Sequence, residues 1–185
     1  MEISQALALI MIIRTEIKDD HSQVYELNYK AFGNRDNESK LIEQIRLSEQ
    51  FIPELSIVAE ADKQIIGHIL LSRAKVVDQV NDQLKEYDVI VLAPIAVSPD
   101  YQKQGVGTQL MLEGMKRTKQ FNYGVILLIG HPTYYPKFGF KPARNYGIEL
   151  TQFKVSDEVF MVCELIEGQL KHCKGELQYP SSFFS

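Results

Sequence analysis

The sequence predicts a mixed α+β fold in which mostly antiparallel strands lead into one parallel strand–helix–strand unit. Residues 89–97 form a nearly all-apolar run, as a strand buried on both faces would. A helical pattern begins at Val106 and stops before Asn122 and Gly124, and a second apolar run follows over residues 125–129. Two strands joined through a helix lie parallel, so these three observations define a parallel crossover.

The elements before this unit follow from local patterns. We expect a strand over residues 12–17, and then a helix that Asp19 or Asp20 caps. The remaining elements in this part are a turn cluster at 32–37, a helix over 38–48, strands over 55–60 and 65–77 joined by a hairpin turn at 61–64, and a polar, mobile hairpin loop over 78–87. Period-two alternation in the strand over 65–77 places His68 and Ser72 on the same face.

The chain after residue 130 predicts shorter elements. A helical turn follows Tyr135, one strand lies somewhere within 141–150, and another covers 159–165. Gly168 ends that strand. We expect the aromatic tail over 179–184 to pack back on the domain.

Composition indicates one ordinary globular domain. Its 185 residues are 45% apolar and 24% charged, and the net charge of −4 gives no basic field for nucleic acid or a membrane. We predict a single domain over 11–185, an N-terminal extension over 1–10, and a cytoplasmic location, because the apolar stretch at 6–13 is too short to span a bilayer. Cys163 and Cys173 are expected to be reduced thiols, no metal is expected, and a homodimer is compatible with the composition.

The turn between the central strand and its helix favours an anionic ligand. Its sequence is Gln-Lys-Gln-Gly-Val-Gly over residues 102–107. The first amides of a helix have no partner within the helix and carry the positive end of its dipole, while glycines remove side chains that would keep an anion away. A dinucleotide-binding loop would need a glycine where Leu110 stands and an acidic residue where Gly130 stands, and no Walker motif occurs.

The order strand, Gln-x-x-Gly-x-Gly, helix, strand and Tyr-x-x-x-Gly-Phe resembles the GCN5-related N-acetyltransferase (GNAT) superfamily. The segments Pro-Ile-Ala-Val-Ser-Pro at 94–99 and His-Pro-Thr-Tyr-Tyr-Pro-Lys-Phe-Gly-Phe at 131–140 are similar to its YhbS-like branch. The resemblance covers residues 11–185. It implies a twisted, mostly antiparallel sheet with helices on both faces, whose parallel pair is splayed at a β-bulge.

The resemblance also implies an acetyl-CoA-dependent N-acetyltransferase that acts on a primary amine of a small molecule or a protein by direct attack in a ternary complex. Tyr135 matches the family's general acid, which protonates the leaving thiolate, and Tyr134 is the competing choice. The backbone N–H of Val97 is the expected oxyanion donor. The residues expected to contact the coenzyme are Ile95, Ala96, Val97, Gln102, Lys103, Gln104, Gly105, Val106, Gly107, Thr108, Gly130, His131 and Tyr135.

The residues alone leave several points open. Candidates for the general base are Glu38, Glu60, His68 and His131, and a water chain could serve instead. The acceptor pocket is expected around residues 32–41 with help from 131–138. Two other hypotheses are a catalytically silent acyl-CoA-binding sensor or partner module, which Tyr135 argues against, and a nucleotide-binding protein of another class.

Overall fold

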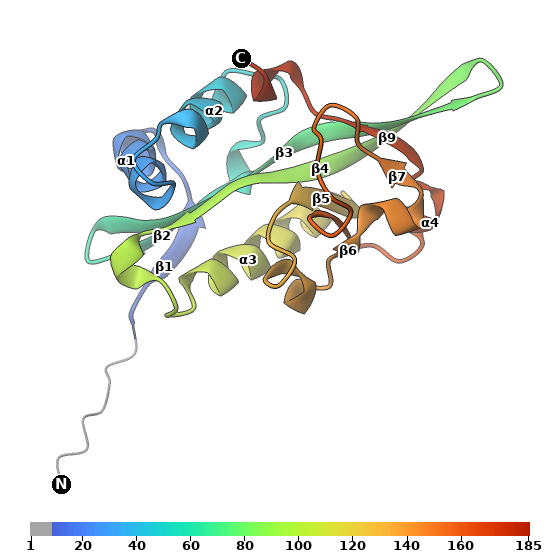
Figure 1. Ribbon diagram of the computed structural model, residues 1–185. Coiled ribbons are helices and arrows are strands. Elements are labelled where there is room, and N and C mark those ends of the chain that lie inside the picture. The colour runs from blue at the N-terminus through green and yellow to red at the C-terminus, as the bar shows by residue number, and fades with distance from the viewer. Residues whose placement is uncertain (1–8) are drawn as a thin grey trace, which may run out of the picture.

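The computed structural model describes residues 9–185, which form one twisted sheet with helices on both faces (Figure 1). The main strand order is β1-β2-β3-β4-β5-β8-β6, and β9 pairs with β3 and β7. The strands are β1 (Ile12–Thr15), β2 (Ser56–Ala61), β3 (Gln64–Val80), β4 (Gln83–Val97), β5 (Val125–Ile129), β6 (Lys141–Pro142), β7 (Ile148–Glu149), β8 (Phe160–Glu164) and β9 (Gly175–Gln178). The helices are α1 (His21–Ala31), α2 (Asn37–Arg46), α3 (Val106–Gln120) and α4 (Gln169–His172).

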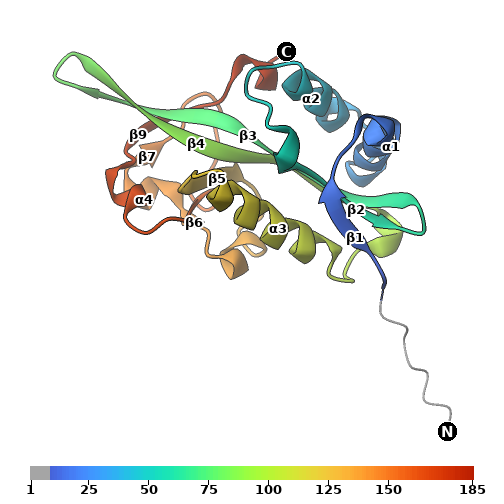
Figure 2. The same ribbon diagram turned by 180° about the vertical axis from the view of Figure 1, so that it is seen from behind.

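Helices α1 and α2 cover one face of the sheet and α3 covers the other, as the two opposite views show (Figures 1 and 2). Two glycines let α3 approach the sheet closely. A Cβ at Gly67 on β3 would lie 2.8 Å from a methyl carbon of Val106, and a Cβ at Gly114 on α3 would lie 2.9 Å from Leu71. Because such contacts are too short for any side chain, small residues here fix α3, and its N-terminus, against the sheet.

Strand β4 contains a bulge that separates it from β5. Ile95 pairs with Ile69 on β3 whereas Leu92 pairs with Leu71, so β4 carries one extra residue near the cis peptide before Pro94. The parallel pairing of β4 with β5 covers only residues 90 and 91 of β4. The two strands then diverge, which confirms the predicted splay of the parallel pair.

The polar stretch 78–87 is strand rather than loop, so that prediction was wrong. Strand β3 continues to Val80, β4 begins at Gln83, and only Asn81 and Asp82 form the turn, both with positive φ. The resulting two-stranded ribbon extends beyond the rest of the sheet (Figure 1). Both of its faces are largely exposed near the tip, so it lacks the apolar alternation that marks a half-buried strand.

The C-terminal part closes the distal end of the sheet. β8 is antiparallel to β5, and the strand expected within 141–150 is divided into the short strands β6 and β7. The aromatic tail packs back as predicted, since Phe153 contacts both Tyr179 and Phe184 with ring centroids 5.2 and 5.1 Å apart. Strand β9, just before this tail, was not anticipated. Cys163 and Cys173 are buried free thiols, and burial raises the pKa of each to about 11.

The N-terminal extension predicted over 1–10 falls mostly on residues outside the described range, although Leu9 already packs against the core. Within residues 9–185 no helix has the length and apolar character needed to cross a bilayer. The same range contains no group of three or more His, Cys, Asp or Glu side chains arranged to hold a metal ion.

Candidate active site

A cavity of about 1120 Å³ lies where β4 diverges from β5. Its walls come from both faces of the sheet: Phe32, Glu38 and Leu41 belong to the α1–α2 side, and Val106 and Tyr134 to the α3 side. Because the pairing of β4 and β5 ends before this point, no hydrogen bond between these two strands closes the sheet there. Two molecules could therefore meet in the cavity from opposite faces.

The turn at the start of α3 presents unpaired backbone N–H groups to this cavity. Gly105 is the N-cap, with a φ of 86° that glycine adopts without strain, and it contributes no side-chain cap. The first helical hydrogen bond runs from Gln109 N to Gly105 O at 3.0 Å, so the preceding amides have no acceptor within the helix. Lys103, also with a positive φ, lies beside them in the cavity wall. This arrangement suits a phosphate group.

The backbone of β4 beside the bulge also faces the gap. Ser98 N donates to Ile66 O at 2.8 Å, which makes Val97 and Gly67 a non-hydrogen-bonded pair. The N–H and C=O of Val97 therefore point away from β3, toward the side from which β5 has diverged. The Gln102 side chain donates to Val97 O at 3.3 Å, which joins the glycine turn to this strand.

Tyr135 is held in the cavity wall by close packing. It is 9% exposed, and its ring occupies the space beside Gly130, where a Cβ would lie 2.3 Å from a ring carbon. The ring also makes an edge contact with Phe140, with centroids 5.9 Å apart. Burial raises the pKa of Tyr135 to about 12, so its phenol is protonated at neutral pH and able to donate a proton.

Tyr134 also lines the cavity, but its hydroxyl lies over the start of α3. A Cβ at Gly107 would be 2.8 Å from this hydroxyl oxygen, and the hydroxyl is hydrogen-bonded to Thr108. Burial raises the pKa of Tyr134, while the bond to Thr108 acts in the opposite direction. Tyr134 therefore lies beside the turn at the start of α3, whereas Tyr135 is more deeply buried.

The structure brings most of the predicted coenzyme residues to the cavity wall and leaves two side chains outside it. Those at the wall are Ile95, Val97, Gln102, Lys103, Gly105, Val106, Gly107, Thr108, Gly130, His131 and Tyr135. The side chain of Ala96 packs instead in the core cluster between the sheet and α1–α2. The Gln104 side chain bonds back to Asp100 O at 3.1 Å.

Tyr101 lines the cavity and was missed from the sequence. Thr133 and Lys137 also line it and lie within the segment 131–138 that was expected to help form the acceptor pocket, and the Lys137 ammonium lies 4.1 Å from the ring centroid of Tyr134. Pro94 lines it too. A proline inside a strand pattern is a recognised sign of a bulge, so that signal was present in the sequence.

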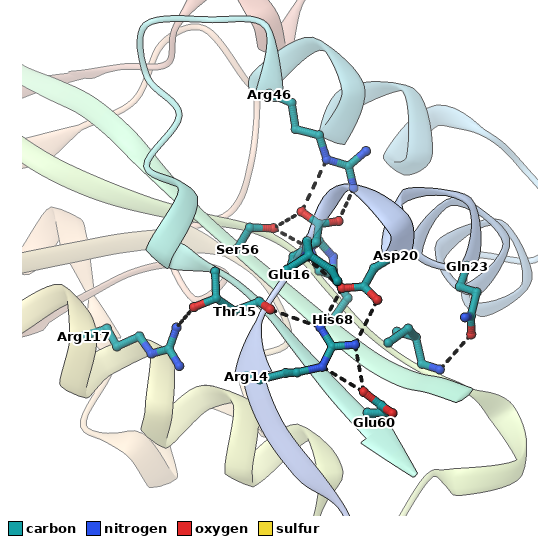
Figure 3. A network of polar contacts seen from close by, with 12 residues as sticks. Arg14, Thr15, Glu16, Asp20, Gln23, Arg46, Ser56, Glu60, His68 and Arg117 are labelled. Atoms are coloured by element: carbon teal, nitrogen blue, oxygen red, sulfur yellow. Dashed lines mark hydrogen bonds and ion pairs between the residues drawn. The ribbon is translucent and has the colours of Figure 1, made fainter. Parts of the chain in front are cut away.

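The four candidate bases separate into two pairs. Glu38 and His131 line the cavity, whereas Glu60 and His68 do not. Glu60 pairs with Arg14 at 2.8 Å, and His68 is fully buried in a polar network between β1, β2, β3 and α2 (Figure 3). The structure therefore leaves two of these side chains in a position to contact an acceptor.

The polar network around His68 is internally bonded. The Ser56 hydroxyl donates to Glu16 at 2.6 Å and lies 3.0 Å from His68 Nε2 (Figure 3). The Ser56 proton is directed at the carboxylate, so His68 Nε2 must be the donor in the second bond. Glu16 is also paired with Arg46. Burial lowers the pKa of His68 to about 4, so the ring is neutral at physiological pH.

A sheet that forks at a bulge, with an open helix N-terminus at the fork, is the architecture of acyltransferases that use a coenzyme thioester. Residues 21–140 match the acetyltransferase (GNAT) family, and the chain belongs to that family.

Known members of the family support this placement. The chain is 34% identical over 125 residues to the uncharacterized N-acetyltransferase YjhQ of Escherichia coli K12, covering 68% of this chain and 66% of that protein. It is 29% identical over 174 residues to the uncharacterized N-acetyltransferase YhbS of the same organism, covering 94% and 98%. The crystal structure of E. coli YhbS in complex with CoA matches with a TM-score of 0.82 and 28% identity, covering 96% and 94%. A GNAT acetyltransferase from Brucella melitensis in complex with acetyl-CoA shares the fold, with a TM-score of 0.73, 24% identity and coverage of 94% and 98%.

Proposed function

We propose that the protein transfers an acetyl group from acetyl-CoA to a primary amine of a small molecule or a protein. The observation that carries the proposal is the open N-terminus of α3, which faces a cavity at the forked strands with a protonated tyrosine in its wall. The CoA complex of E. coli YhbS, which matches nearly the whole chain, supports the same choice of donor.

In this proposal the coenzyme lies along the α3 side of the fork. The amides at residues 105–108 and the side chains of Gln102 and Lys103 hold the pyrophosphate, whereas the Gln104 side chain is turned back to Asp100 O. The pantetheine arm runs beside residues 95–97 as an added strand would, using the backbone groups that face away from β3. The thioester then reaches the region of Gly130, His131 and Tyr135.

The reaction is a direct attack within the ternary complex. The neutral amine nitrogen forms a bond to the thioester carbonyl carbon, and the oxyanion that develops is stabilised by the N–H of Val97. The carbon–sulfur bond then breaks, and Tyr135 donates its proton to the CoA thiolate as that group leaves. The amine loses its own proton to water, or through water to His131 or Glu38, which line the cavity.

The test is an acceptor screen with the full chain. Acetyl-CoA is mixed with a panel of small primary amines and of peptides carrying a free lysine or N-terminus, and released CoA thiol is measured. Acetyl-CoA binding is measured separately by calorimetry. We expect micromolar binding and thiol release that depends on the amine, with the acetylated product detected by mass spectrometry. Binding of acetyl-CoA without thiol release on any amine would favour an acyl-CoA sensor over an enzyme. Absence of acetyl-CoA binding would contradict both hypotheses.

A further inference from the structure

Among the described residues that line the cavity, Glu38 is the only one with a carboxylate. It lies in the first turn of α2, on the face of the sheet opposite α3. The positively charged wall residues, Lys103 and Lys137, belong to the glycine turn and to the aromatic segment before β6. The cavity therefore has a negative group on its α2 side and positive groups elsewhere.

Glu38 has hydrogen-bonding capacity that residues 9–185 do not use. Its side chain is 18% exposed, and one carboxylate oxygen accepts from Arg35 at 2.6 Å. The other, Oε2, is buried and has no hydrogen-bond partner among the described residues. A buried, unpartnered carboxylate oxygen is costly, so the carboxylate would gain by turning toward an N–H donor of a ligand in the cavity that this side chain lines.

The pairing with Arg35 does not prevent such binding. The Arg35 side chain is 60% exposed, and exposed ion pairs contribute only about 0–1 kcal/mol. The position of Glu38 is better fixed, because the neighbouring Ser39 hydroxyl on α2 donates to Tyr25 O of α1 at 2.8 Å. A carboxylate held on an anchored helix is suited to selecting a ligand.

The groups beside Glu38 indicate the rest of that ligand. Phe32 and Leu41 line the same part of the cavity and present an aromatic and an aliphatic surface. From these observations we propose that Glu38 selects acceptors with a positively charged amine on an apolar body, and that Phe32 and Leu41 contact that body. This inference rests on the proposed function, because the ammonium group that binds Glu38 is the acceptor amine before it loses its proton.

This arrangement sorts the two substrates by charge. The phosphates of a coenzyme are attracted to the open helix end and Lys103, and Glu38 repels them from the acceptor side. A cationic amine is attracted to Glu38 and repelled by the lysines. Each substrate is thereby directed to its own side of the forked strands.

The test compares a phenylalkylamine with the phenylalkyl alcohol of equal length, titrated by calorimetry into the full chain saturated with CoA. Wild type is expected to bind the amine about 10- to 100-fold more tightly, the contribution of one charge-assisted hydrogen bond. In Glu38→Gln this preference should disappear while CoA affinity is unchanged. Glu43→Gln removes the same charge from an exposed position of the same helix and should keep the preference.

The outcomes separate this inference from the proposed function. Loss of the preference in Glu38→Gln alone supports the inference, even if no amine releases thiol and the acetyltransferase proposal fails. Equal binding of amine and alcohol by wild type, no binding of either, or a preference retained in Glu38→Gln would overturn it. In turnover assays with a cationic acceptor, Glu38→Gln should raise KM about tenfold or more with a smaller change in kcat.

Discussion

Two regions of the molecule gather similar polar residues and use them differently. The network around Glu16, Ser56 and His68 pairs nearly all of its polar atoms with one another, and His68 Nδ1 is the exception. At the fork, the amides at the start of α3 and one oxygen of Glu38 have no protein partner within the described residues. A polar group already bonded inside the protein stabilises the fold, whereas one left free at a cavity wall is available to a ligand.

The comparison matters because, from the sequence alone, histidines and glutamates in both regions were equally good candidates for the general base. His68 and His131 were both candidate bases, as were Glu60 and Glu38. Only burial and hydrogen bonding separate them: His68 is fully buried against Ser56, and Glu60 is paired with Arg14. Substitutions in the two regions should therefore affect different quantities.

The largest effect is expected at the fork, from Tyr135→Phe. Removing a general acid costs about 10²- to 10⁴-fold in rate, so kcat should fall by that factor while acetyl-CoA affinity and stability change little. Steady-state thiol release with an acceptor found in the screen measures the rate. Tyr179→Phe, a buried tyrosine remote from the cavity, is the matched control. If Tyr134→Phe gave the loss instead and Tyr135→Phe left turnover unchanged, the two tyrosines would exchange roles.

The next effect is expected in the network, from Arg46→Ala. The side chains of Arg46 and Glu16 are 9% and 2% exposed, so the substitution leaves a buried carboxylate unpaired. The free energy of unfolding should fall by about 3–5 kcal/mol, with coenzyme affinity intact in the folded fraction. Chemical denaturation measures this change. The control Lys40→Ala breaks the exposed pair with Asp36 and should lower the free energy of unfolding by at most about 1 kcal/mol. Equal losses of stability in the two variants would contradict the conclusion that the buried network contributes more than an exposed pair.

The smallest effect is a pH dependence of stability that comes from His68. Burial is the main cause of its low pKa of about 4; Glu16 raises the value and Arg46 lowers it further. The unfolded chain therefore takes up a proton first as the pH falls. The stabilisation is complete above pH 6.5 and is lost as the pH falls through 4, by up to about 3 kcal/mol.

Denaturation midpoints measured between pH 4 and 7 test this dependence. The slope should be flatter in His68→Gln and unchanged in His172→Gln, which alters an exposed histidine. An identical slope in wild type and His68→Gln would show that other groups govern the loss at acid pH.

Much of the fold was predictable because its central unit is locally encoded. The apolar runs at 89–97 and 125–129, and the glycine turn between them, mark their elements by composition alone. The strand nature of residues 78–87 was missed, because both faces of that ribbon are largely solvated and the expected apolar alternation is absent. Strand β9 is four residues long and forms only by pairing with distant residues of β3 and β7.

The site residues likewise fall into those predictable from local sequence and those that depend on distant contacts. The positions of Gly105 and Gly107 at the start of α3 could be predicted from the sequence, because they depend only on the local turn. The two tyrosines could not be distinguished from the sequence, because they differ in tertiary packing. Tyr135 packs its ring against Gly130, whereas the hydroxyl of Tyr134 lies over Gly107. The separation of His68 from the cavity depends on Glu16 and Ser56, which lie 52 and 12 positions away along the chain.

The position of the cavity at the fork bears on inhibitor design. Its wall contains the open start of α3 on one face of the sheet and Glu38 on the other, and no pairing of β4 with β5 separates them. One molecule with a phosphate group at one end and an ammonium group at the other could therefore contact both. Joining the two ends makes the second contact intramolecular, so such a molecule should bind more tightly than either half alone.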